Sequence, residues 1–118
     1  MSLVEFLAAV KSQKPISFAE TIAVINDNYH YQPCEFSNGL NAEQLINSAR
    51  TNEGSCRIFA FAQLHQLTEQ ETLHLFGDFY YVDVLDYPEG ISHANIRTFM
   101  KYGWKGIDFK GNALQVID

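Results

Sequence analysis

Basic side chains are scarce in this chain of 118 residues, which has eight lysines and arginines against fourteen aspartates and glutamates and a net charge of −6. A protein that binds nucleic acid or an anionic membrane surface needs a basic face. The few cations are scattered, with Arg97, Lys101, Lys105 and Lys110 loosely grouped near the C-terminus. We therefore expect no nucleic acid and no membrane as partners, and we interpret the acidic balance as a solvated surface.

Cysteines and long apolar runs are also rare. Cys34 and Cys56 form neither a C-x-x-C pair nor a disulfide framework, so a reducing compartment is the simpler expectation. No apolar run approaches the ~20 residues that a membrane span requires. The first residues lack a basic n-region and carry Glu5 where a signal peptide is apolar. These absences predict a cytoplasmic protein.

Apolar surface is plentiful, because 47% of the residues are hydrophobic and nine are Phe and six Tyr. Such a composition excludes a disordered chain. Domains most often have about 100–150 residues, so we expect residues 1–118 to form a single domain.

Three capping boxes predict where helices begin. In each, a Ser or Thr hydroxyl can accept a hydrogen bond from the third helical amide, whose Glu side chain reaches back. Apolar residues follow at helical spacing, which predicts helices over about 3–13 and 18–30 and a third that starts after Thr68. Gly77 would end or weaken the third helix, and Asp78 can cap a continuation through Leu85. The boxes are Ser2–Glu5, Ser17–Glu20 and Thr68–Glu71.

The most apolar segment predicts the centre of the fold. A helix over about 56–66, capped by Ser55, has apolar residues around most of its circumference and should be buried. Before it, the segment 33–54 reads mostly as loop. Short strands near 34–36 and 45–46 are one interpretation there, and a short helix capped by Asn41 is another.

A last helix is expected over 93–102. Ser92 would cap it, Ile91 and Ile96 would form a hydrophobic staple, and Gly103 would end it.

The C-terminal residues change to the alternating pattern of strands. Residues 107–109 and 114–116 alternate around a Lys110-Gly111-Asn112 turn, which predicts a hairpin over about 106–117. Two strands alone are marginal in water, so the hairpin must lie on the helices or gain a strand from 33–48. The predicted class is α+β and predominantly helical, with five or six helices around the central one.

Cys56 is the first candidate for chemistry. A cysteine in the first turn of a helix lies near unpaired amides that favour thiolate, and His93 or His74 is a candidate base, oriented by Asn95 or Asp78. A papain-type signature, however, has an aromatic residue after the cysteine, where this chain has Arg57. Free cysteine is also among the most buried residue types. We predict a structural thiol, with a thiol-dependent hydrolase or transferase centred on Cys56 as an alternative.

The same turn is a candidate ligand site. The amides of Gly54 and Ser55 at a helix start, with Arg57 nearby, could hold a carboxylate or phosphate, although Glu53 opposes an anion. A small-ligand-binding protein that uses the 52–57 turn is therefore a second alternative. Metal and cofactor sites are not expected, because the single Glu-x-x-His at 71–74 lacks the further ligands that such a motif needs.

Tyr81 and Trp104 are candidates for partner binding. Tyr81 and its neighbour Tyr80 lie in an aromatic and acidic segment over 78–89, and the two tyrosines cannot both face inward on one helix. Trp104 lies between Gly103 and Gly106, where it can anchor the C-terminal strands on the helices. If Trp104 is exposed instead, it becomes the first candidate for a partner-binding anchor.

Several stretches, in order along nearly the whole chain, match the pattern of a known family. They are FAETIAVI at 18–25, NY at 28–29, FSNG at 36–39, NEGSC at 52–56, IFAFA at 58–62, FG at 76–77, DVL at 83–85, PxGxxHxNIRxFM at 88–100, GW at 103–104 and GI at 106–107. On these stretches the chain resembles the HopJ family, which is named after a type III effector of plant-pathogenic bacteria. The resemblance implies delivery by a type III system, but no activity and no site residue.

Together these observations predict a non-catalytic role in protein interaction, with an unknown protein partner, inside the bacterial cell or after delivery to a host. Export is the less favoured of the two, because an effector normally has a pliable N-terminus and here a capping box at Ser2 starts a helix at once.

Overall fold

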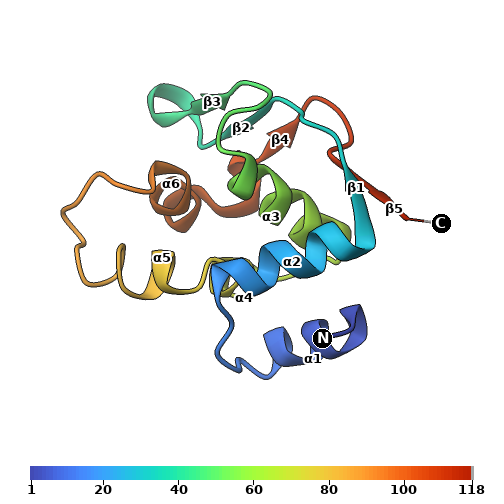
Figure 1. Ribbon diagram of the computed structural model, residues 1–118. Coiled ribbons are helices and arrows are strands. Elements are labelled where there is room, and N and C mark those ends of the chain that lie inside the picture. Colours follow the sequence, from blue (N-terminus) through green and yellow to red (C-terminus); the bar gives the residue numbers. More distant parts are fainter. Residues whose placement is uncertain (118) are drawn as a thin grey trace.

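The computed structural model describes residues 1–117, in which five α-helices and two small antiparallel sheets surround a sixth, central helix (Figure 1). The helices are α1 (Leu3–Lys11), α2 (Phe18–Asn28), α3 (Glu53–Leu64), α4 (Glu69–His74), α5 (Asp78–Tyr81) and α6 (Ala94–Tyr102). The strands are β1 (Tyr29–Tyr31), β2 (Phe36–Asn38), β3 (Leu45–Asn47), β4 (Asp108–Phe109) and β5 (Leu114–Val116), and the 3-10 turns are η1 (Asn41–Glu43) and η2 (Gly103–Gly106). The predicted α+β class is confirmed.

Helices α1, α2 and α4 begin at the three predicted capping boxes. In the first box the Glu5 amide donates to Ser2 Oγ at 3.1 Å and the Ser2 amide donates to the Glu5 carboxylate at 3.1 Å. The boxes at Ser17 and Thr68 have the same reciprocal pair of bonds. These sequence predictions are therefore confirmed, although α1 and α2 end two residues earlier than expected.

Helix α3 is the centre of the core, as predicted, and contacts α2, α4 and β5 (Figure 1). Phe59 is fully buried, and its ring centroid lies 5.0–5.9 Å from those of Phe36, Phe76 and Phe99. This side chain of α3 therefore contacts β2, the residues after α4, and α6. The predicted start of this helix needs correction. Its N-cap is Asn52, in a left-handed conformation with φ of 50°, and Ser55 is already the third helical residue.

Gly77 separates α4 from α5 because it lies against the backbone of another segment. Its φ is +59°, and a Cβ there would lie 2.9 Å from both the Ile16 carbonyl oxygen and the Phe18 amide nitrogen. A larger residue would push the start of α2 away, so the two short helices cannot merge into one. The second of these helices does not continue to Leu85 as predicted, since α5 ends at Tyr81 and turns follow it.

The start of α6 also differs from the prediction. The N-cap is His93 with φ of 53°, and Ser92 lies outside the helix. Ile91 is 93% exposed, so it does not form the predicted staple with the buried Ile96. The reason is Arg97, whose guanidinium bonds the carbonyl oxygens of the preceding loop and holds that loop away from the core. The predicted end at Gly103 is confirmed.

The β elements form the sheets β3-β2-β4 and β1-β5. Both strands of the predicted C-terminal hairpin are present, but each pairs with an earlier strand: Phe109 faces Phe36, and Leu114 faces Tyr31. Between them the Gln32 amide donates to the Ala113 carbonyl. Residues 108–116 thus run antiparallel to residues 29–37 in a single continuous register. A proline at position 33 interrupts the pairing, because it has no amide to donate.

A cavity between the first turns of two helices

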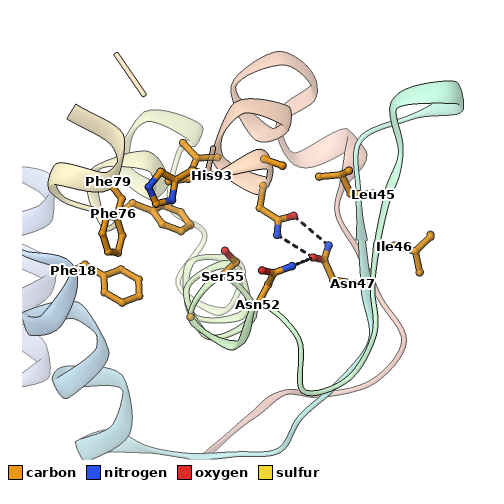
Figure 2. A pocket seen from close by; sticks show the side chains of 13 residues that line it. Phe18, Leu45, Ile46, Asn47, Asn52, Ser55, Phe76, Phe79 and His93 are labelled. Carbon is orange, nitrogen blue, oxygen red and sulfur yellow. Dashed lines mark hydrogen bonds between the residues drawn. The ribbon is translucent and has the colours of Figure 1, made fainter. Parts of the chain in front are cut away.

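The largest group of candidate site residues lines a cavity of about 470 Å³ where the first turns of α3 and α6 meet (Figure 2). One wall is polar and comes from β3 and the two helix starts. The opposite wall is aromatic and comes from α2, α5 and the residues before Gly77. The lining residues are Phe18, Leu45, Ile46, Asn47, Asn52, Gly54, Ser55, Phe76, Phe79, His93, Ala94, Asn95 and Ile96.

The polar wall is held together by asparagine side chains. Asn47 Nδ2 donates to Asn95 Oδ1 at 3.1 Å, and Asn95 Nδ2 donates back to Asn47 Oδ1 at 2.9 Å (Figure 2). Asn52 Nδ2 adds a bond of 2.7 Å to Asn47 Oδ1, and Asn38 Nδ2 donates to Asn95 Oδ1 at 3.1 Å. Asn38, Asn47 and Asn95 are buried, so the bonds compensate for the loss of water, and among the described side-chain atoms of these three residues only Asn38 Oδ1 lacks a partner. The network fixes the start of α3 relative to the start of α6.

Both helices present unpaired backbone amides at this wall. Asn52 and His93 are left-handed N-caps, and among the described residues no side chain caps either helix. The first amides of a helix have no acceptor within it. The amides of Gly54 and Ser55 in α3, and of Asn95 in α6, likewise have no other acceptor within the described part of the chain. Two positive helix ends therefore flank the same cavity.

The aromatic wall consists of rings that contact one another. Phe18 and Phe79 lie 4.8 Å apart between ring centroids, and the His93 ring stacks on Phe79 at 4.8 Å and 28°. His93 Nε2 donates to the Asp83 carboxylate at 3.0 Å, because an ionised carboxylate can only accept. That bond orients the imidazole at the edge of the cavity. Gly54 lets Phe18 approach α3, since a Cβ there would lie 2.6 Å from the Phe18 ring.

The structure brings three of the sequence candidates together: Gly54, Ser55 and His93 all line the cavity. The carboxylate expected to oppose an anion at this turn points elsewhere, because Glu53 Oε1 accepts a bond of 3.0 Å from the Tyr31 hydroxyl.

Cys56 lies away from His93 and outside the cavity lining. The residue is 1% exposed, and its Sγ donates to the Cys34 carbonyl oxygen at 3.6 Å. Burial raises the pKa of the Cys56 thiol, which disfavours thiolate. The other candidate base, His74, is held at 2.6 Å by the Tyr81 hydroxyl and at 2.7 Å by the Lys14 carbonyl oxygen. The structure thus does not assemble the thiol and base that the hydrolase alternative needs.

Arg57 and Tyr81 also lie apart from the cavity. The Arg57 guanidinium carbon lies 3.8 Å above the Tyr31 ring, and its Nε donates to Asn26 Oδ1 at 3.1 Å. Tyr81 is partly exposed and bonds His74, while its neighbour Tyr80 is buried, so the two tyrosines do face different ways.

Trp104 joins η2 to the corner between α3 and α4. Its Nε1 donates to the Leu67 carbonyl at 3.1 Å, its amide donates to the Glu69 carboxylate at 3.0 Å, and its ring meets Phe99 edge-on at 5.1 Å. The indole is half-buried, so it anchors the connection to the C-terminal strands on the helices without being enclosed.

Comparison with known proteins places the chain in a family. The family model for the HopJ type III effector protein matches residues 3–114. The chain belongs to the HopJ family. A solved structure described as "Crystal structure of unknown function protein VPA0580" is 47% identical, with a TM-score of 0.92 over 99% of this chain and 95% of that chain. No curated protein matches.

The described residues of this HopJ-family protein bear on two other classes of site. Within residues 1–117, no three His, Cys, Asp or Glu side chains come together in a way that could hold a metal ion. None of the described helices combines the length and the apolar character that a membrane crossing requires.

Sequence reasoning missed most of the cavity in this HopJ-family chain. The sequence predicts no site role for Asn47 and Phe18, includes Asn52 only as the first residue of the 52–57 turn, and gives Asn95 only as a partner for a catalytic His. Their meeting depends on contacts between residues up to 57 positions apart in the asparagine network. A weak signal was present: polar asparagines beside otherwise apolar segments need partners if they are buried.

Proposed function

We propose that this protein acts by binding rather than by covalent catalysis, and that the α3–α6 cavity holds a small molecule with a carboxylate or phosphate group on an apolar body. The observation that carries the proposal is the pairing of walls: the starts of two helices, which no described side chain caps, and the rings of Phe18, Phe76 and Phe79 line the same cavity of about 470 Å³. Small-molecule sites commonly have this size and this mixture of apolar surface with a few placed polar groups.

The polar wall suits an anionic group. The amides of Gly54, Ser55 and Asn95 are donors, and the two helix dipoles each favour a nearby negative charge by about 0.3–1 kcal/mol. Because Glu53 is turned toward Tyr31, its carboxylate does not occupy this wall. The rings of Phe18, Phe76 and Phe79 would cover the apolar part of the ligand.

Binding without catalysis is supported by the state of the candidate nucleophile. Cys56 is buried with a raised pKa, and its hydrogen bond goes to a backbone carbonyl. The His93 side chain faces the cavity, but its described partners are Asp83 and the Phe79 ring. A nucleophile activated by a base needs the two side chains within hydrogen-bond reach.

The test is calorimetric titration with phenylacetate and phenyl phosphate as anionic probes and with 2-phenylethanol as the neutral analogue. We expect the anionic probes to bind the wild type and Ala23→Leu, a matched control on the exposed face of α2, and to lose affinity for Ala94→Leu, which fills the cavity. Equal affinity for Ala94→Leu and the control, or stronger binding of the neutral analogue, would contradict the proposal.

A role in protein interaction is the second candidate, and a different observation favours it. Several apolar side chains between α5 and α6 are exposed, among them Leu85, Tyr87 and Ile91. Monomeric proteins seldom expose large connected apolar patches without a binding role.

A further inference from the structure

A second surface, separate from the cavity lining, combines exposed apolar side chains with carboxylates. We call it the 82–91 surface and define it as the exposed side chains Val82, Leu85, Tyr87 and Ile91 of the connection between α5 and α6, together with Met100 of α6. Ile91 is 93% exposed and projects into solvent from this connection. Exposed apolar side chains that gather in one short segment, unlike single scattered ones, are typical of a binding surface.

The surface contains a hollow of about 210 Å³. Leu85, Pro88 and Met100 line it together with the buried Val84 and with Arg97, whose guanidinium donates to backbone carbonyl oxygens of the loop. A hollow of this size can take one or two large aliphatic side chains, which is how an amphipathic helix anchors itself in a groove.

The loop that forms the surface is held in place before any partner arrives. Arg97 of α6 donates to the carbonyl oxygens of Ser92 at 2.6 Å, Tyr87 at 2.8 Å and Asp83 at 3.3 Å. One guanidinium thereby ties three points of the loop to a helix. A surface ordered in advance loses less entropy when it binds.

Charge indicates the chemistry of the partner. Asp86 and Glu89 are exposed beside the apolar side chains, and the nearest cation, Arg97, donates its hydrogen bonds to backbone carbonyls. A second copy of the chain would bring a second set of carboxylates to the same place, which opposes self-association. A basic segment would complement them.

We propose that the 82–91 surface docks a basic amphipathic helix of a partner protein, with aliphatic side chains in the hollow beside Leu85 and Met100 and with lysines or arginines facing Asp86 and Glu89. The inference rests on the protein-interaction candidate given above and is independent of the cavity, because none of the residues that define the surface lines it.

The test uses a fluorescent synthetic peptide about 14 residues long, roughly four helical turns, with leucines at helical spacing and lysines elsewhere. Fluorescence anisotropy measures its affinity for the full chain, beside a peptide in which glutamates replace the lysines. We expect the lysine peptide to bind in a salt-dependent manner and the glutamate peptide to bind at least about tenfold more weakly, since each tenfold corresponds to about 1.4 kcal/mol.

Matched variants locate the site. Leu85→Ser, Ile91→Ser and Asp86→Asn should each weaken lysine-peptide binding by about fivefold or more, whereas Leu64→Ser and Asp27→Asn, which alter exposed residues elsewhere, should not. Ile91 is almost fully exposed, so its variant tests the surface without unfolding the chain. Phenylacetate titration of the same samples reports the cavity separately.

Three results would overturn the inference. One is equal peptide affinity in the Leu85→Ser and Leu64→Ser variants. Another is equal binding of the glutamate peptide. The third is a concentration-dependent dimer of the wild type that Ile91→Ser abolishes, because a second copy of the chain would then be the occupant.

Discussion

Asn47 and Asn95 exchange reciprocal hydrogen bonds through their side-chain amides, although 48 residues separate them in the chain. Asn47 belongs to β3 and Asn95 to the first turn of α6. Because Asn52, the N-cap of α3, bonds the same Asn47 oxygen, the pair fixes the distance between the two helix starts that flank the cavity. Buried and hydrogen-bonded polar groups therefore lie at the place where we propose that a ligand binds.

Asn95→Ala tests this bracing. The change removes the acceptor of the buried Asn47 Nδ2, whereas Asn38 Nδ2 keeps its 2.9 Å bond to the backbone carbonyl of residue 95, so we expect the free energy of unfolding to fall by about 1–3 kcal/mol. Urea unfolding measures the loss. Asn112→Ala, an exposed asparagine near the C-terminus, is the control and should change stability little. Equal stability of the two variants would mean that the network does not brace the helix starts.

Cys56 should react slowly with thiol reagents in the folded protein. It is buried and its thiol pKa is raised, so little thiolate is available and access is blocked. The measurement is the rate of labelling in Cys34→Ser, which removes the half-buried second thiol, with and without denaturant. Fast labelling of the native variant, with a pKa below that of free cysteine, would revive the thiol-enzyme alternative.

His65 predicts a dependence of stability on pH. Burial lowers the pKa of His65, whose Nε2 lies 2.5 Å from the Tyr29 hydroxyl. The unfolded chain takes up a proton near its ordinary pKa of 6.5, while the folded chain resists until a lower pH. The contribution of neutral His65 to the free energy of unfolding is thus fully present above pH 6.5, and it is lost as the pH falls below that value.

Urea unfolding between pH 8 and about pH 5.5 measures this loss above the range where carboxylates titrate. His65→Gln should flatten the decline, and His30→Gln, at an exposed position, should leave it as in the wild type. The same decline in both variants would assign the effect to other groups.

The N-terminal helix should be part of the fold. Phe6 is fully buried and its ring meets Phe61 edge-on at 5.9 Å, so Phe6→Ala should cost about 3–5 kcal/mol. Deletion of residues 1–14 should destabilise the protein still more, because Val10 is lost from the core as well. Thermal unfolding checks both, with the exposed Val4→Ala as control. An unchanged melting temperature after the deletion would reopen the export interpretation.

Local signals made much of the fold predictable. Capping boxes located three helix starts because their hydrogen bonds lie within four residues, and the apolar circumference of α3 indicated burial directly. The pairing of 108–109 with 36–37 agrees with the expectation that the C-terminal strands gain a partner from 33–48. The pairing of 114–116 with 29–31 was not predictable in this way, because the alternation of 107–109 and 114–116 fits a hairpin equally well.

The cavity was harder still to predict. It exists because Asn52 and His93 take left-handed N-cap conformations, which residues other than glycine adopt uncommonly and which no pattern in the sequence marks. Gly54 and Ser55 were found because a helix start can be predicted. The opposite wall depends on Phe18 and Phe79 packing together across 61 residues, which only the folded chain brings about.

The central claim, that the α3–α6 cavity binds a small anionic ligand, is tested most directly by amide chemical shifts in nitrogen–proton correlation spectra during phenylacetate titration. We predict saturable shifts concentrated at Gly54, Ser55, Ala94 and Asn95, which Ala94→Leu removes and Ala23→Leu preserves. Unchanged amides at these four positions, or saturable shifts confined to the neighbourhood of Trp104, would contradict the account.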